Sequence, residues 1–566
     1  MKKTTILLAS LALSACSTMQ NTAQTAASQP AATAPQAPEF SVPQMKEMVR
    51  QLSSDEFEGR GPSTPVEPKV LDYIVSQFKA AGLQPGNKGE WLQAVPMVAI
   101  QAVQPGPLTI TGPGTRSGKP LSFTFGNQFV AGSYRVVPQT RIADSEMVFV
   151  GYGINAPELG WNDYAGLNMK GKTAVILVND PDYAAETEEG LFKGRRMTYY
   201  GRWTYKFEEA ARQGATAALI VHDTFPAAYG WNVVQSGWEG EQNMVQSAND
   251  GMDQTAANGW VQKDVAEAMF KASGKDFAAL SAAAKQKGFK AVPLGLKASL
   301  SFDNTIRKAN SYNVVGMLPG TTRPDEYVLY SAHWDHLGRC TPDATGDDIC
   351  NGAVDNATGV AAITAIAQAN AQMGPTARSQ VFIALTLEES GTLGSEYYAA
   401  NPVFPLERTV GGVNLDSLAP SGLTRNFAMT GGDKSELNDL FRAALARHGL
   451  VEAAEQHSER GYYYRSDHFS FAKLGVPMFT VGRGTDLVDG GDAAGQAISD
   501  AYSTNHYHAP SDEYSEDWDW TGIVQEMTLD FELGRELAQG ATWPNWRPTD
   551  EFRTIRDKSC AARGVC

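Results

Sequence analysis

Val328-Leu-Tyr-Ser-Ala-His333-Trp-Asp335-His336 is the stretch around which the chain is organised. Val328 to Ala332 predicts a buried strand, because this apolar run is too short for a helix and ends in polar residues. His333 then lies at the carboxyl end of that strand. In open α/β sheets this edge is where ligands bind.

Acidic residues follow two further predicted strands. Residues 381–387 lead directly into Glu388 and Glu389, and residues 410–415 lead into Asp416. The same arrangement of a strand ending in polar side chains therefore occurs three times. We expect these side chains to meet at one edge of a sheet.

Two more candidate ligands stand outside the strands. Asp355 precedes an alanine-rich segment whose apolar residues recur at helical spacing, so it lies at the mouth of a helix. His508 lies in the proline-containing turn Tyr-His-Ala-Pro-Ser-Asp512. An acidic residue in such a place is often only a helix cap or turn former, and Asp512 has that interpretation.

Two imidazoles and three carboxylates suit two Zn²⁺ ions, with one carboxylate bridging them and water completing the sites. Paired metals polarise a carbonyl and acidify a water. Glu388 is not one of the predicted ligands, and we expect it to act as the general base that takes a proton from that water. The predicted metal ligands are His333, Asp355, Glu389, Asp416 and His508.

Five motifs in this order resemble the signature of the M28 family of zinc peptidases, which includes bacterial aminopeptidases and relatives of glutamate carboxypeptidase. They are His-x-Asp, Asp-Asn-Ala-Thr-Gly, Glu-Glu-x-Gly-x-Leu-Gly-Ser, Asn-Leu-Asp and Tyr-His-x-Pro-x-Asp.

The resemblance implies a role for each ligand. Asp355 would bridge both zincs, His333 and Asp416 would complete one site, and Glu389 and His508 the other. The carboxylate of Asp335 would hold His333 in its ligating tautomer. The resemblance also implies a cis peptide bond after Asp355. We expect His336 and His506 to line the site.

A second segment of chemical interest is Tyr463-Tyr-Arg-Ser-Asp-His468. Ser466 and Asp467 can cap a following helix, so His468 would project from its first turn. The resemblance implies that His468 hydrogen-bonds the developing oxyanion, with a packing role as the alternative. Tyr463 is a candidate wall of the substrate pocket.

The acidic, glycine-rich residues 486–500 predict a flexible loop before His508. Clustered carboxylates can bind Ca²⁺, but their spacing is not that of an EF-hand. A solvated loop is the favoured interpretation.

Length and composition indicate a globular protein of two or three domains, since the chain has 566 residues and 42% hydrophobic residues. The formal net charge is −16, from 47 basic and 63 acidic residues. Such a charge argues against nucleic acid as a partner. The net charge does not restrict the charge of a substrate near the metals, because bound zinc ions would make the local charge positive.

The start of the chain predicts export. Residues 1–15 combine two lysines with a short apolar run and small residues before Cys16. They resemble a bacterial lipoprotein signal with Cys16 as the lipidated residue, and Ser17 favours the outer membrane, facing the periplasm. Residues 16–41 predict a flexible tether, so the lipid would be the only membrane contact. Release after an ordinary signal is the alternative.

Four further cysteines suggest two disulfides in an oxidising compartment. Local pairing, Cys340 with Cys350 and Cys560 with Cys566, is preferred among the three possible connectivities. Zinc ligation by these cysteines is disfavoured because no Cys-x₂-Cys spacing occurs.

The predicted fold is α/β, with a mixed, largely parallel sheet flanked by helices, because strands and helices alternate around the candidate ligands. Helices are expected over residues 42–52 and 65–81. Residues 42–137 would begin the peptidase domain, 291–545 would carry the metal site, and 546–566 would be a tail. Residues 138–290 resemble the smaller inserted protease-associated (PA) domain of some M28 enzymes, acting as a lid or structural insert.

The predicted activity is hydrolysis of N-terminal residues from peptides, and the choice of aminopeptidase rests on the resemblance. A carboxypeptidase or dipeptidase is the alternative on the same scaffold, with Arg465 or Arg483 reading the substrate carboxylate. A single-zinc relative of glutaminyl cyclase, or a non-catalytic binding protein, is disfavoured by the full ligand set and Glu388.

Overall fold

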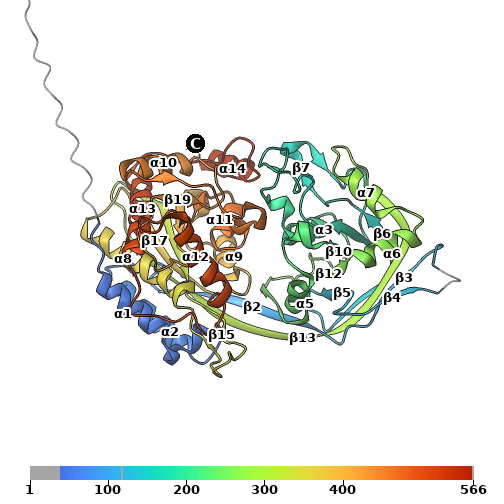
Figure 1. Cartoon of the computed structure of the whole chain (residues 1–566), viewed down its shortest axis with the longest axis horizontal. Helices are drawn as coiled ribbons and strands as arrows, with labels where there is room; N and C mark the ends of the chain where they lie inside the picture. Colours follow the sequence, from blue (N-terminus) through green and yellow to red (C-terminus); the bar gives the residue numbers. More distant parts are fainter. Residues whose placement is uncertain (1–37, 116–118, 564–566) are drawn as a thin grey trace, which may run out of the picture. The chain divides into compact units, whose positions relative to one another are not determined.

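The computed structural model describes residues 38–115 and 119–563. The predicted signal segment, Cys16 and Cys566 lie outside these residues. We call residues 38–91 and 319–563 the main lobe and residues 104–291 the insert lobe. Two strands connect them, β2 (Leu92–Val103) and β13 (Val292–Leu318), which lie side by side as antiparallel partners (Figure 1).

β13 is 27 residues long and belongs to the sheets of both lobes. Its amino-terminal part pairs with β6 (Gln139–Phe149) and its carboxyl-terminal part with β17 (Arg378–Leu385). One mixed sheet therefore runs from the main lobe into the insert lobe. The predicted α/β class with a mixed sheet is confirmed.

In the main lobe, β14 (Arg323–His333) lies between β17 and β18 (Thr409–Asn414) and is parallel to both. Successive side chains of a strand point to opposite faces. Tyr330 accordingly packs in one hydrophobic cluster and Leu329 in another. Helices cover both faces, giving three layers.

The Tyr330 face is covered by α1 (Val42–Leu52), α2 (Glu67–Ala80), α8 (Thr358–Gln372), α10 (Leu437–Arg447) and α13 (Thr521–Gln539). The Leu329 face is covered by α9 (Leu393–Ala400) and α11 (His468–Lys473). The two helices expected at the amino-terminal end are α1 and α2.

The insert lobe repeats this layering on a smaller scale. Its parallel strands are β6, β9 (Lys172–Leu177), β10 (Ala217–His222) and β12 (Ala257–Gln262), with β5 (Phe129–Gly132) antiparallel at the edge. On one face packs α6 (Lys263–Ala272), and on the other α3 (Trp203–Arg212) and α5 (Trp231–Glu239).

Strands that precede residue 138 also pack in the insert lobe. β3 (Leu108–Thr111), β4 (Leu121–Phe123) and β5 contribute to the same hydrophobic cluster as β6. The sequence analysis had assigned these strands to the amino-terminal part of the main domain, because nothing in their local pattern distinguishes the two cores.

The segment expected as a flexible loop at 486–500 is largely helical. α12 spans Gly491–Asn505. Alanines at 493, 494, 497 and 501 favour a helix, and the prediction gave them too little weight beside the glycines and carboxylates.

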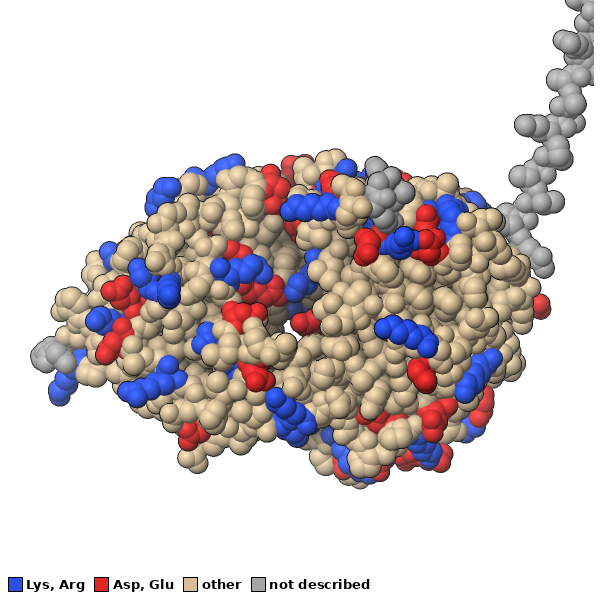
Figure 2. Space-filling view, turned by 180° about the vertical axis from the view of Figure 1, so that it is seen from behind, with Lys and Arg blue, Asp and Glu red and all other residues tan. Residues whose placement is uncertain are grey.

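Acidic and basic side chains are interspersed over the face in Figure 2. The predicted lack of nucleic-acid binding stays a prediction. Within residues 38–115 and 119–563, no helix has both the length and the apolarity of a membrane span.

Candidate metal centre

Three predicted ligands lie at the ends of adjacent parallel strands. His333 is the last residue of β14, Glu389 follows β17, and Asp416 follows β18. The register pairs His333 with Leu385 and Ser331 with Asn414, so the three strands end on the same edge of the sheet. Strand pairing thus brings together side chains that are far apart in sequence.

Asp355 lies in a turn that leads into α8, and its peptide bond to Asn356 is cis. The carboxylate of Asp512 accepts the backbone N–H groups of Val354 and Asp355 at 3.0 and 3.1 Å. Asp512 belongs to the same turn as His508 and is buried. It therefore ties the turn that carries Asp355 to the turn that carries His508, a role beyond the helix cap considered from sequence.

The five predicted ligands form two groups that share Asp355. In the first, Nε2 of His333 lies 3.2 Å from Oδ1 of Asp355 and 3.3 Å from Oδ1 of Asp416. In the second, Nε2 of His508 lies 3.4 Å from Oδ2 of Asp355 and 3.2 Å from Oε2 of Glu389. The two oxygens of Asp355 thus face different imidazoles, the arrangement that a bridging carboxylate needs.

His336 also belongs to this cluster. Its Nδ1 donates to Oε1 of Glu389 at 2.6 Å, and its Nε2 is buried without a hydrogen-bond partner in the described chain. Donor atoms of His336, Asp355 and Glu389 all lie within 4.8 Å of one another, as do those of His333, Asp355 and Asp416. His336 therefore contacts a predicted ligand directly, whereas the sequence analysis placed it only as a lining residue.

The donor set fits zinc. Imidazole nitrogens and carboxylate oxygens in groups of three, leaving room for water or substrate, are typical of catalytic zinc sites. The turn that carries Asp355 is held by backbone N–H groups that donate to the carboxylate of Asp512, which leaves the carboxylate oxygens of Asp355 out of these bonds.

A backbone carbonyl selects the tautomer of His333. Its Nδ1 lies 3.0 Å from the carbonyl oxygen of Asp335, which can only accept, so Nδ1 carries the proton. In the neutral imidazole, the form that binds metal, the lone pair of Nε2 then points at Asp355 and Asp416. The carboxylate of Asp335 was expected to do this, but it is 3.9 Å from Nδ1 and instead accepts the backbone N–H of Glu388 at 3.2 Å.

Glu388 lies beside the donor groups without belonging to either. Burial raises the pKa of its carboxyl well above the ordinary range, the positive charge of His333 opposes this, and Asp416 adds to it. A carboxylate with a raised pKa is a stronger base than one in water, which suits proton transfer.

Charge interactions favour the ionised carboxylates of the ligands. Burial alone would raise the pKa of Asp355, but hydrogen bonds from His333 and His508 hold it well below the usual range. Burial alone would lower the pKa of His333, but the negative charges of Asp416 and Glu388 raise it well above the ordinary value. Protons on these imidazoles would compete with metal, so metal binding has to release them.

Arg60 fixes the backbone around the ligands. Its guanidinium is fully buried and donates four hydrogen bonds of 2.6–2.8 Å to main-chain carbonyls. The acceptors are the carbonyls of Leu52, Trp334, Asn351 and Gly352. Arg60 therefore joins the segments that carry His333 and Asp355. No local sequence signal reveals this, because its partners lie up to 292 positions away.

Tyr463 packs in the hydrophobic cluster of the insert lobe, and His468 lies close enough to Asp416 to interact with its charge. His468 is the first residue of α11, and burial lowers its pKa to about 4, so its imidazole is neutral at pH 7. The ring of Tyr463 lies 4.6 Å from that of His468, centroid to centroid. The expected cap is absent: the side chain of Asp467 makes no capping bond, and Ser466 donates to Asp416 at 2.7 Å.

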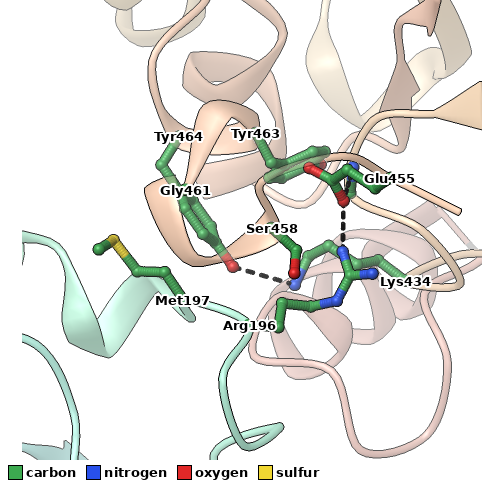
Figure 3. Close-up of a pocket in the computed structure, with 9 residues that line it drawn as sticks. Arg196, Met197, Lys434, Glu455, Ser458, Gly461, Tyr463 and Tyr464 are labelled. Carbon is green, nitrogen blue, oxygen red and sulfur yellow. Dashed lines mark hydrogen bonds and ion pairs between the residues drawn. The ribbon is translucent and has the colours of Figure 1, made fainter. Parts of the chain in front are cut away.

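Tyr463 lines a small cavity where the two lobes meet (Figure 3). Arg196 of the insert lobe forms an ion pair there with Glu455, and Lys434 lies 3.5 Å from the hydroxyl of Tyr464. Met197 donates its backbone N–H to Ser458 at 3.1 Å. None of the cavity's lining residues is a predicted ligand, so it is a contact between lobes rather than the metal centre.

A disulfide joins Cys340 to Cys350 between His333 and Asp355 in sequence. Cys566 lies outside the described residues, so the pairing of Cys560 with Cys566 stays a prediction. The carboxylates of residues 486–500 belong to neither metal-donor group found among the described residues. The calcium alternative gains no support.

Part of the chain is similar in sequence to curated proteins. A segment of 130 residues is 30% identical to "Aminopeptidase NAALADL1" of Rattus norvegicus, covering 22% of this chain and 16% of that protein. A segment of 119 residues is 34% identical to "Probable zinc metalloprotease" of Pyrenophora teres f. teres, covering 21% of this chain and 25% of that protein. The chain therefore matches a quarter or less of the length of these relatives.

Among solved structures, the aminopeptidase from Aneurinibacillus sp. strain AM-1 is 19% identical, with 89% of this chain and 95% of that chain aligned and a TM-score of 0.44. Residues 313–531 match the family model described as Peptidase family M28. All five predicted ligands and Glu388 lie within the matched range.

Proposed function

We propose that this chain is a metal-dependent exopeptidase that removes N-terminal residues from peptides, using two zinc ions and Glu388 as general base. The observation that carries the proposal is the pair of donor groups sharing Asp355, whose two oxygens face His333 and His508 at 3.2 and 3.4 Å.

His333 and Asp416 would hold one ion, Glu389 and His508 the other, and Asp355 both. Bound zinc ions would polarise the scissile carbonyl and acidify a water. His336, which already contacts Glu389, would orient that carboxylate or replace His508 as a donor. The ligand set suits this chemistry, because His333, Glu389 and Asp416 meet at one strand edge and Asp355 and His508 face them from two turns.

Glu388 would take a proton from the attacking water and pass it to the leaving amine nitrogen. Its raised pKa makes it a competent acceptor, and the hydrogen bond from its backbone N–H to Asp335 fixes its position at the strand end. A carboxyl that accepts and then donates one proton returns to its starting state after each turnover.

His468 would donate a hydrogen bond to the oxygen on which negative charge develops. A neutral imidazole carries one N–H, and burial keeps His468 neutral at pH 7. Nε2 of His468 is buried without a partner in the described chain, so it is available for this contact.

Two alternatives differ in what the site must contain. A single-metal transferase or a metal-retaining binding protein would not need both donor groups together with Glu388. A carboxypeptidase would need a free guanidinium near the metals. Arg483 is not free, because its nitrogens donate to the carbonyls of Ala419, Ser421 and Gly422. Arg465 is exposed, and its side chain makes no hydrogen bond within the described residues, so the substrate test has to separate the two activities.

Export and lipidation extend the proposal to the start of the chain. Residues 1–16 carry the lipoprotein-like pattern, and we propose an outer-membrane anchor at Cys16 with the enzyme in the periplasm. Cys16→Ala should give soluble or unprocessed protein. Continued membrane fractionation of a processed form would argue against the anchor.

The activity is tested with three substrate sets: aminoacyl substrates, N-blocked peptides and C-blocked peptides, each with and without a chelator. We expect chelator-sensitive release of N-terminal residues from substrates with a free amino group. Cleavage of N-blocked peptides from the carboxyl end would favour the carboxypeptidase. No cleavage of any set by the zinc-loaded protein would contradict the proposed function.

A further inference from the structure

The helix α11, which begins with His468, is held between the two lobes. It has only six residues, and all of those before Lys473 are buried. An isolated helix of this length is not stable in water, so its place depends on what it packs against. Phe471 packs in the main-lobe cluster that contains Leu329, whereas Phe469 packs in the cluster of the insert lobe. Both lobes therefore decide where α11 lies.

An aromatic side chain of the insert lobe forms one wall for α11. Tyr199 is the first residue of the 3₁₀ turn η4 (Tyr199–Gly201) and is buried. Its ring centroid lies 5.1 Å from that of Phe469 and 6.2 Å from that of Tyr464 in the main lobe. Aromatic pairs at such distances attract each other beyond the effect of burial. Tyr199 thus supports α11 from the side of the insert lobe.

A carboxylate of the insert lobe holds the carboxyl-terminal end of α11. Nζ of Lys473, the last residue of this helix, lies 2.8 Å from Oε1 of Glu208 on α3. The hydroxyl of Tyr199 donates to Oε2 of the same carboxylate. Burial alone would raise the pKa of Glu208, but the charge of Lys473 lowers it, so this carboxyl is ionised at pH 7. Glu208 therefore restrains the helix and its aromatic wall together.

The main lobe orients the ring of His468 itself. The ring centroid of Tyr463 lies 4.6 Å from that of His468, and Oγ1 of Thr480 lies 3.2 Å from Nδ1. These contacts leave Nε2 buried without a partner in the described chain. The insert lobe acts on the same helix through Phe469 and Lys473. The position of Nε2 therefore depends on contacts from both lobes.

The proposed reaction is sensitive to a small shift of α11. Six helical residues span roughly 9 Å, so a movement of the Lys473 end is carried to His468. A donor stabilises a developing oxyanion only when it lies within about 2.7–3.1 Å of that oxygen. Misplacement by about 1 Å can cost on the order of 100-fold in rate. Contacts at one end of α11 can therefore control a hydrogen bond at the other end.

We propose that the insert lobe is a positioning element of the active site, in which Tyr199 and Glu208 hold α11 and thereby keep Nε2 of His468 within reach of the reacting oxygen. This inference rests on the proposed function and deepens it. It gives the insert lobe a role different from that of a lid, because a lid has to open and close while these contacts hold a group in place. Tyr199 and Glu208 act through α11 and do not touch the substrate.

Steady-state kinetics of zinc-loaded variants test this restraint. Lys473→Met and Glu208→Gln should each lower kcat by about tenfold or more with little change in KM, because the affected hydrogen bond belongs to the transition state. Lys473→Arg keeps the charge and should retain more turnover than Lys473→Met. The double variant of Glu208→Gln and Lys473→Met should be about as active as Lys473→Met alone, because both changes break one contact.

Lys263→Met is the matched control. Nζ of Lys263 lies 2.6 Å from Oδ2 of Asp223, so this change also removes an ion pair of the insert lobe, but on α6 rather than beside α11. It should leave kcat unchanged. If Glu208→Gln does not fold, Lys473→Met still decides the test, because the side chain of Lys473 is 34% exposed. Loss of zinc from Lys473→Met would show an effect on the metals and would overturn the inference.

The ring nitrogen signals of His468 separate this inference from the proposed function. With ¹⁵N-labelled histidine in the zinc-loaded protein, the signals that disappear in His468→Gln belong to this ring. We expect these signals to shift or broaden in Lys473→Met and Glu208→Gln and to stay the same in Lys263→Met.

Unchanged signals in both test variants, or a normal kcat in both, would overturn the positioning role and leave the peptidase proposal standing. Displaced signals in a protein whose parent form hydrolyses no peptide would support the restraint on His468 and contradict the proposed function.

Discussion

The carboxylate of Asp512 accepts the backbone N–H of Asp355 at 3.1 Å, so a side chain near the end of the domain positions the residue that both donor groups share. Asp512→Asn replaces one accepting oxygen by a donor. We expect zinc affinity to fall by about 10–100-fold, as for other groups that orient a ligand. Competition with a chelator measures this, and Asp517→Asn, an exposed residue of the same segment, is the control. Unchanged affinity in Asp512→Asn would contradict the positioning role.

Glu388→Gln tests the general base. The amide keeps the shape of the side chain but cannot take a proton, so turnover should fall by about 10²–10⁴-fold. Zinc content should not change, because Glu388 belongs to neither donor group. Metal analysis and steady-state kinetics measure the two effects, with the exposed Glu407→Gln as control. Normal turnover in Glu388→Gln would contradict the role of Glu388 as general base.

Asp355→Ala tests the bridge. Loss of the carboxylate removes a donor from both groups, so the protein should lose metal and stability together. We expect the free energy of unfolding in excess zinc to fall by about 3 kcal/mol or more, the contribution of a ligand present well above its Kd. Metal content and denaturant unfolding report this, beside the exposed Asp253→Ala. Full zinc content in the variant would mean that the bridge is elsewhere.

Arg60→Met tests the buried scaffold. Four main-chain carbonyls lose their donor at once, so the free energy of unfolding should fall by about 3–4 kcal/mol. Arg60→Lys should recover only part, because an ammonium lacks the planar fork. Urea unfolding of the zinc-loaded protein measures both, and the exposed Arg339→Met serves as comparison. A loss below about 1 kcal/mol in Arg60→Met would be incompatible with four bonds that water cannot replace.

Glu526 predicts a pH dependence of stability. Burial on α13 raises its pKa from 4.5 to about 7, although Arg483 lies 3.6 Å away and opposes the shift. Between these values the folded protein holds a proton that the unfolded chain has released. The stabilisation from this proton is therefore complete below the unfolded pKa and is lost as pH rises to about 7.

Glu526→Gln removes this dependence. Relative to the parent protein, the variant should gain about 3 kcal/mol in free energy of unfolding as pH rises through that interval. Chemical unfolding at a series of pH values measures the difference. Glu536→Gln, an exposed position on the same helix, should show no such trend. A constant difference for Glu526→Gln would contradict the raised pKa.

Local pattern was enough to find the strands and the side chains at their ends. The apolar run before His333 is β14, the run before Glu388 is β17, and the alanine-rich segment after Asp355 is α8. These elements depend on the alternation or spacing of neighbouring residues, which the chain displays directly. Where local signals conflicted, as in α12, the prediction failed because it weighed glycine and charge above alanine.

Interactions between distant segments were the part that sequence did not reveal. The carbonyl of Asp335, rather than its carboxylate, accepts the hydrogen bond from Nδ1 of His333. The carboxylate of Asp512 accepts the backbone N–H of Asp355 and so holds the turn that carries this ligand. Glu58 pairs with Arg339, whereas Arg60, two positions later, is buried among main-chain carbonyls. The partner of a side chain depends on which distant segment the fold brings beside it. The pattern of neighbouring residues in the sequence does not contain that information.

By itself, the order of residues determined which groups are chemically able to bind metal and that they stand at strand ends, because those are properties of side chains and of short-range periodicity. Only the tertiary structure decided that the two oxygens of Asp355 face different imidazoles, that His336 contacts Glu389, and that Tyr199 of the insert lobe packs against Phe469 of α11. Those relationships arise from parallel strand pairing and from the packing of two lobes, which act over hundreds of positions.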